Sequence, residues 1–99
     1  MFIDEFVWLP DIIQKLEAKH RVSPDEVEEV FFNAPKYRFV ESGHRPGEDV
    51  YSAGGQTDGG RYLIVFFVHK IGNDKIGNDA LILTARDMDS KERRRHERK

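Results

Sequence analysis

The longest apolar run in the chain is residues 62–68, Tyr-Leu-Ile-Val-Phe-Phe-Val. β-Branched and aromatic side chains without polar alternation are typical of a central strand that is covered on both faces. The run is far too short to cross a bilayer as a helix. We therefore expect a sheet with this strand at its centre and covering elements on both sides.

Further strands are predicted on either side of this run, because apolar residues alternate at a period of two or cluster between turn residues. These stretches are residues 37–41, 50–56 and 80–86, and the central strand itself is predicted over residues 61–69. Asp58-Gly59 is typical of a two-residue hairpin turn. Such a turn predicts Tyr51 opposite Phe66 and Val50 opposite Phe67, in an antiparallel sheet of about four strands.

Two helices are predicted before the sheet. Leu9, Ile12, Ile13 and Leu16 fall on one helical face, which indicates a helix over about residues 10–20. A second helix begins with Ser23 as N-cap and Glu26 as the other half of a capping box. Residues 33–35, Asn-Ala-Pro, end it. The sequence therefore predicts an N-terminal αα-hairpin packed on the sheet.

A tandem duplication separates the last two predicted strands. Lys-Ile-Gly-Asn-Asp occupies residues 70–74 and again residues 75–79. Both copies contain Gly and Asn, which suit turns. We interpret the duplication as a tolerated insertion at a hairpin tip, with a substrate-reaching arm as the alternative.

A short basic helix is predicted at the C-terminus. Asp89 and Glu92 form a second capping box, and residues 93–99 read Arg-Arg-Arg-His-Glu-Arg-Lys. From Asp89 onward there is no apolar residue, so such a helix is not stable alone and is either docked or frayed. Together these elements predict a single α+β domain over residues 1–99.

The charge is divided unevenly along the chain. Residues 1–60 hold 12 acids against 6 Lys and Arg, whereas residues 61–99 hold 6 acids against 10, although the net charge is only -2. A positive end can attract phosphates locally. Alternatively, the acidic and basic parts face each other in the fold.

Composition also limits the chemistry. The chain has no cysteine, which excludes disulfides and thiolate metal sites and suits the cytoplasm. The first eight residues do not resemble a signal peptide. Four histidines, at 20, 44, 69 and 96, lack metal-ligand spacing. We expect a cytoplasmic protein with no membrane partner, no metal and no cofactor.

Several segments, in order along nearly the whole chain, resemble the BrnT family of toxins. They are Trp8, residues 19–23 (KHRVS), 26–31 (EVEEVF), 47–51 (GEDVY), 55–59 (GQTDG), 82–86 (ILTAR) and Glu92-Arg93. The resemblance implies a RelE-like fold and a toxin of a type II toxin-antitoxin system. It further implies metal-independent endoribonuclease activity on mRNA that inhibits growth, and inhibition by a ribbon-helix-helix antitoxin similar to BrnA. Operator DNA would be bound only through that antitoxin, and a homodimer is left open.

Two departures from the family pattern keep an alternative function open. His96 stands where many members have Tyr, and Val50 where many have Arg. The alternative is a catalytically weak or inactive homologue that acts as an antitoxin-binding and regulatory protein, or as an RNA-binding module.

Candidate catalytic residues follow from the resemblance and from the needs of RNA cleavage without a metal. That reaction requires proton transfer and cations that stabilise the phosphate charge. Arg86 is the first candidate for the stabilising cation, with a salt bridge to Asp87 or Asp89 as its structural alternative. Arg93 is the second candidate, and His96 is the acid or base, or else an exposed polar residue.

Candidate RNA-binding residues lie outside this group. Lys19 and His20 end the first predicted helix, where cations also stabilise the helix dipole. Arg45 lies in a Gly- and Pro-rich loop that a solvated turn explains equally well, and Arg94 belongs to the basic helix. We expect these four side chains to add general attraction for RNA.

Overall fold

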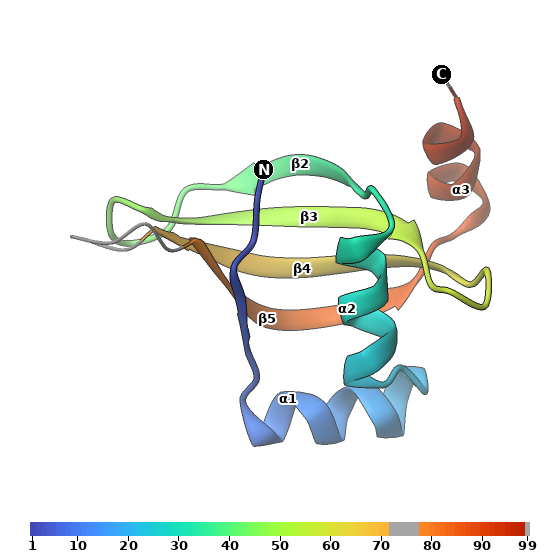
Figure 1. The fold of residues 1–99 in the computed structure, drawn as a ribbon, viewed down its shortest axis with the longest axis horizontal. Helices are drawn as coiled ribbons and strands as arrows, with labels where there is room; N and C mark the ends of the chain where they lie inside the picture. The colour runs from blue at the N-terminus through green and yellow to red at the C-terminus, as the bar shows by residue number, and fades with distance from the viewer. Residues whose placement is uncertain (72–77, 99) are drawn as a thin grey trace.

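The computed structural model describes residues 1–71 and 78–98, and within them the chain folds as an α+β domain (Figure 1). The sheet has the strand order β1-β5-β4-β3-β2. The elements are β1 (Glu5–Val7), α1 (Pro10–Lys15), η1 (Leu16–His20), α2 (Pro24–Phe32), β2 (Lys36–Glu41), β3 (Glu48–Gln56), β4 (Tyr62–Ile71), β5 (Asn78–Asp87) and α3 (Ser90–Glu97). The α+β class is confirmed, and β4 is central as predicted. The duplicated segment lies mostly in residues 72–77, outside the described residues.

The predicted sheet of about four antiparallel strands is wrong in one respect: the described chain contains a fifth strand. β1 pairs in parallel with β5, with Phe6 opposite Ala80 and Val7 opposite Leu81. Three residues are too few to show a period, so the sequence carries no strand signal there. Phe6 is held by its edge-on contact with Phe31, whose ring centroid lies 5.0 Å away.

The αα-hairpin is confirmed. Pro10 occupies the first turn of α1, and the helix continues through the π-helical turn η1 until Arg21 adopts a left-handed conformation. The Ser23 and Glu26 capping box forms as predicted, because each side chain accepts from the other residue's backbone N–H. No helix among the described residues is long and apolar enough to span a membrane.

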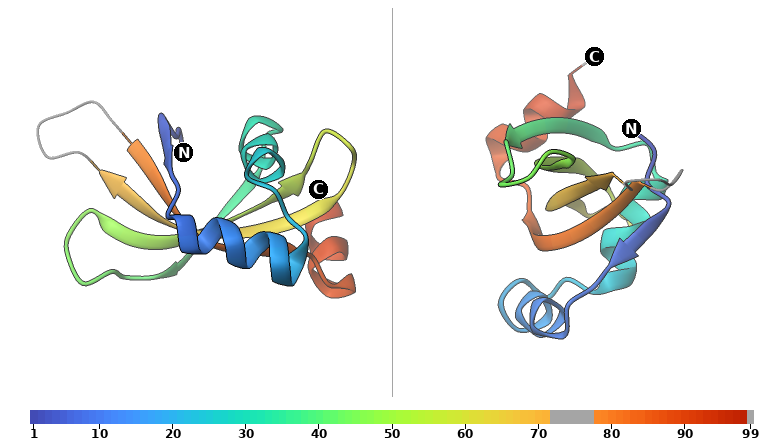
Figure 2. Two further views of the ribbon diagram at one scale, coloured as in Figure 1. Left: turned by 90° about the horizontal axis from the view of Figure 1, so that it is seen from below. Right: turned by 90° about the vertical axis from the view of Figure 1, so that its left-hand side faces the viewer.

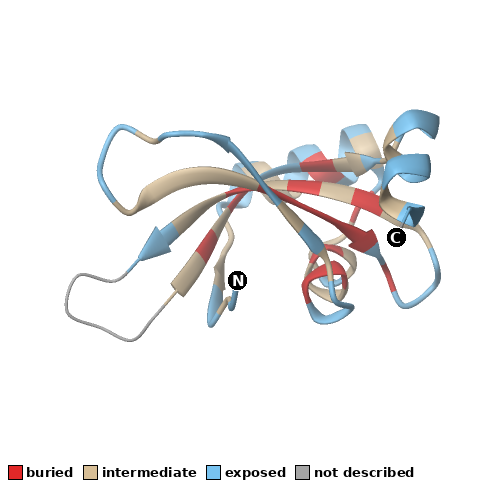
Figure 3. Cartoon of the chain, turned by 90° about the horizontal axis from the view of Figure 1, so that it is seen from above, coloured by how far each residue is buried: buried red, intermediate tan, exposed pale blue. Residues whose placement is uncertain are grey.

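The core lies between α2 and one face of the sheet. Val27, Val30 and Phe31 of α2 pack with Val65 and Phe67, all buried. Gly55 permits this approach, because a Cβ there would lie 3.3 Å from Val30 Cγ1. Figure 3 shows the buried positions concentrated on α2 and the strands, whereas α3 is exposed or intermediate.

The β3–β4 hairpin differs from the predicted register by one residue. Tyr51 lies opposite Phe67, and Gln56 opposite Tyr62. The backbone N–H of Gly60 donates to the carbonyl of Thr57, and Gly60 has φ +91°. The turn therefore uses a third loop residue in a conformation that glycine favours, which shifts every pair by one.

The opposite face of the sheet is only partly covered. Figure 2 shows α3 on the side of the sheet away from α2. Ile64, Phe66 and Val68 point to this open face and are half-buried, in contrast to Val65 and Phe67 on the core side. The prediction that the central strand is covered on both faces is therefore wrong for its outer side.

Candidate functional site

A pocket of about 360 Å³ lies between α3 and the open face of the sheet. Gly54 supplies no side chain at its floor, and Ile64 adds an apolar surface beside it. The remaining wall comes from β2, β3 and the segment that contains α3. The lining residues are Lys36, Tyr37, Arg38, Ser52, Gly54, Ile64, Met88, Glu92, Arg95 and His96.

The small residues of β3 explain why the pocket exists. A Cβ on Gly54 would lie 3.0 Å from Met88 Cε and 4.0 Å from His96 Nδ1. Ser52 lies on the same face two residues earlier. The small side chains of Ser52 and Gly54 thus leave the pocket open, whereas Gly55 faces the core.

Polar contacts dock α3 on the sheet, so this helix is held without an apolar face. The Asp89 and Glu92 capping box forms at its start. The Arg93 guanidinium lies over the Tyr62 ring, 4.2 Å from its centroid, and His96 meets the same ring edge-on at 5.9 Å. Arginine stacking on an aromatic face adds a favourable interaction.

Arg86 forms a salt bridge, but not with Asp87 or Asp89, the two partners suggested by the sequence. Its two terminal nitrogens donate to the two carboxylate oxygens of Glu92, at 2.7 and 2.9 Å. Hydrogen bonds from Arg86 lower the pKa of the Glu92 carboxyl, against the opposing effect of burial. The Arg86 side chain is still 40% exposed.

His96 lies half-buried at the pocket, next to a lysine that the sequence analysis missed. The Lys36 ammonium donates to the His96 carbonyl and, at 3.0 Å, to that of Arg98. It therefore caps the C-terminal end of α3. Burial, and then the charge of Lys36, lower the pKa of His96, which favours a neutral imidazole at neutral pH.

We expect His96 to titrate below the value of about 6.5 that is ordinary for histidine, and Lys36→Met to raise its pKa. Its charged form is disfavoured in the folded state. The contribution of His96 to folding stability is therefore largest at pH values above its pKa in the unfolded state. This contribution is lost as the pH falls through its lowered pKa in the folded state. NMR titration of the imidazole measures both shifts. Lys91→Met is the control, and an unchanged pKa in Lys36→Met would contradict the effect of Lys36.

The three arginines of α3 have different positions. Arg93 covers Tyr62, Arg95 lines the pocket, and Arg94 is exposed and does not line it. β2 adds Arg38, which pairs with Ser52 across the strands. Alternation along β2 places Lys36 and Arg38 on one face, a signal that the sequence contained.

The other candidate RNA-binding residues do not join this pocket. Lys19 and His20 line a separate pocket with Leu83 and Thr84, next to β5. Arg45 lies in the β2–β3 loop at the opposite end of the sheet from α3 (Figure 1).

Of the predicted catalytic residues, only His96 lines the pocket. Arg93 shares the Tyr62 ring with His96, and Arg86 binds the lining residue Glu92.

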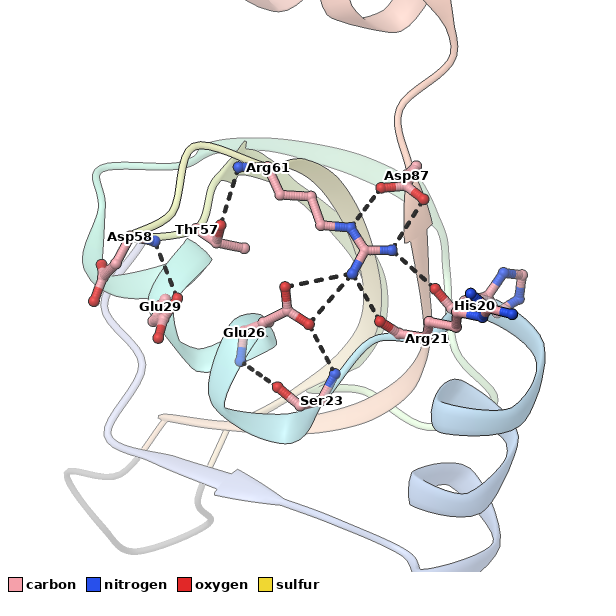
Figure 4. Close-up of polar contacts among 9 residues, drawn as sticks. All are labelled: His20, Arg21, Ser23, Glu26, Glu29, Thr57, Asp58, Arg61 and Asp87. Atoms are coloured by element: carbon pink, nitrogen blue, oxygen red, sulfur yellow. Dashed lines mark hydrogen bonds and ion pairs between the residues drawn. The ribbon is translucent and has the colours of Figure 1, made fainter.

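Arg61 organises a polar network that the sequence did not reveal (Figure 4). Its guanidinium binds the Asp87 carboxylate at 2.7 and 3.0 Å and the Glu26 carboxylate at 3.3 Å. It also donates to the backbone carbonyls of His20 and Arg21, at 2.9 and 2.7 Å. Arg61 thereby joins the helix corner, the start of α2 and the end of β5.

Comparison with known proteins identifies no family: no family model matches the sequence, and no curated protein is significantly similar to it. Among residues 1–71 and 78–98, no three His, Cys, Asp or Glu side chains are grouped so as to hold a metal ion.

Proposed function

We propose that the protein is a cytoplasmic toxin of a type II toxin-antitoxin system that cleaves mRNA without a metal. One observation carries the proposal: a pocket on the open sheet face combines a half-buried imidazole, His96, with the cations Lys36, Arg38 and Arg95. Arg93 belongs to α3, as His96 does, and Arg86 binds Glu92 of that helix. RNA cleavage needs this combination of a proton acceptor and phosphate-binding cations.

Each group has a defined part in the proposed reaction. Neutral His96 accepts the proton of a ribose 2'-hydroxyl, whose oxygen attacks the adjacent phosphorus. The bond from phosphorus to the 5'-oxygen breaks, and that oxygen takes a proton from water, which leaves a cyclic phosphate and a free 5'-hydroxyl end. Arg86 and Arg93 stabilise the charge that develops on the phosphate, because guanidinium groups bind phosphate oxygens in pairs.

The test is expression of the chain alone, followed by cleavage of single-stranded RNA by the purified protein in the presence of a metal chelator. We expect growth arrest and cleavage that the chelator does not reduce. Products should end in a cyclic phosphate. If the protein neither slows growth nor cleaves RNA, the proposal fails.

A second candidate function is an RNA-binding or regulatory protein without catalysis. The observation that favours it is the bidentate pairing of Arg86 with Glu92, which already satisfies two donors of the guanidinium. The residue at position 96 is also His rather than the Tyr of the family pattern. RNA that is bound but never cleaved would favour this alternative.

The proposed partner is a ribbon-helix-helix antitoxin, which would carry the operator-binding activity. A surface for it is available on the core side of the sheet, where Phe32 and Phe39 are 75% and 56% exposed. Phe6 contacts Phe32, and Tyr51 contacts Phe39, so both rings extend the aromatic core outward. Exposed apolar surface of this kind is typical of protein interfaces. Co-purification with the product of an adjacent gene tests the partnership.

A further inference from the structure

We propose that the pocket beneath α3 binds a single nucleobase, turned out of a single-stranded RNA, and so gives the cleavage a base preference. The inference rests on the proposed function for its substrate. Its own basis is the shape and chemistry of the pocket. At about 360 Å³ it falls in the range of roughly 300–1,000 Å³ found for small-molecule sites.

The pocket presents apolar surface to a flat ligand. Gly54 leaves the floor without a side chain, and Ile64 lies opposite it on the neighbouring strand. Met88 faces Gly54 from the segment before α3, and its thioether makes favourable contacts with aromatic rings. The Met88 methyl group already packs on Gly54, so a base would lie beside Met88 and over Ile64, in contact with apolar groups of both.

Ser52 supplies a polar group within the pocket. The residue is 4% exposed overall and lines the pocket. Its hydroxyl can both donate and accept a hydrogen bond, and a base edge offers donors and acceptors to it. This hydroxyl is the group expected to distinguish one base from another.

The charge around the pocket favours an anionic ligand. Lys36, Arg38 and Arg95 line it, against the single acid Glu92, whose charge is balanced by Arg86. Recognition of single-stranded RNA combines such cations with stacking of individual bases. An apolar slot beside phosphate-binding cations therefore fits a nucleotide better than a purely apolar ligand.

Binding of nucleoside monophosphates, followed by NMR of the Ile64 and Met88 methyl groups, tests the proposal without any cleavage. We expect each monophosphate to shift both methyl signals, one base to bind most tightly, and ribose 5-phosphate to bind at least about tenfold more weakly. If ribose 5-phosphate binds as tightly as the nucleotides, or if no nucleotide shifts these methyls, the pocket is not a base site.

Two variants test whether the nucleotide binds in this pocket. Gly54→Ala adds a methyl group at the floor that displaces only the flexible end of Met88, and we expect affinity to fall about tenfold. Ser52→Ala should reduce the difference between bases. Thr84→Ala, on the same sheet face but outside the pocket lining, is the control. Equal losses in all three variants, or tight binding of an acidic peptide and no nucleotide, would overturn the proposal.

The outcome for the pocket is separable from the outcome for the proposed function. Base-dependent nucleotide binding by a protein that never cleaves RNA supports the pocket and contradicts the nuclease. Cleavage whose site preference is unchanged in Gly54→Ala and Ser52→Ala supports the nuclease and overturns the base pocket.

Discussion

Arg86→Ala is expected to lower RNA cleavage by about 10²–10³-fold, while RNA affinity falls less than about tenfold. Arg86 lies on the open sheet face, opposite the pocket residue Ile64, and its side chain is 40% exposed. In the proposed reaction its charge is needed most when the phosphate gains charge during cleavage, and less when RNA merely binds. Single-turnover cleavage and equilibrium RNA binding measure the two effects separately.

Two controls separate a catalytic part for Arg86 from a structural one. Lys70→Ala removes one positive charge at the far end of the sheet and should leave cleavage almost unchanged. Glu92→Gln removes the charge that Arg86 balances, although it retains the shape of the side chain. If Arg86 acts only by docking α3, Glu92→Gln will lower cleavage as much as Arg86→Ala does, and that result would contradict the catalytic assignment.

The elements that the sequence predicted well are those with local signals. Ser23 with Glu26, and Asp89 with Glu92, are separated by three residues, so one helical turn brings each capping pair together. The alternation of apolar residues at a period of two after Pro35 likewise indicates strands directly. The position of Arg86 beside α3 followed from the connection between β5 and α3, which is short.

Features that depend on distant partners were not predictable. β1 is a strand only because β5 lies beside it, and Phe6 is held by α2. Lys36 contacts the end of α3, although it lies 60 residues before His96 in the sequence. The one-residue error in the β3–β4 register came from Gly60, because a two-residue and a three-residue loop are both consistent with Asp58-Gly59-Gly60.

The contacts of Arg61 also depend on partners that are distant in the sequence, so they were not predictable. We expect substitution of this residue to have the largest effect on stability. Arg61→Ala should lower the free energy of unfolding by about 3 kcal/mol, because it leaves charged and backbone acceptors of three elements without their donor. Thermal unfolding should shift downward by roughly 10–20 °C for a domain of this size. Circular dichroism during heating measures the shift.

The pH dependence distinguishes this network from general packing. Hydrogen bonding from Arg61 lowers the pKa of the Asp87 carboxyl. The Arg61–Asp87 pair therefore stabilises the fold most at pH values above the ordinary Asp pKa of about 3.9. This stabilisation is lost as the pH falls through the lowered pKa of Asp87 in the folded state. The difference in stability between the wild type and Arg61→Ala should accordingly shrink in acid.

Matched variants make the prediction for Arg61 specific. Arg61→Lys keeps the charge but lacks the planar fork that binds Asp87 and two carbonyls together, so its loss should be intermediate. Arg94→Ala removes an exposed arginine of α3 and should change stability by no more than about 0.5 kcal/mol. If Arg61→Ala is as mild as Arg94→Ala, the helix corner is held by core packing alone, since Leu16 and Val22 are buried on either side of it.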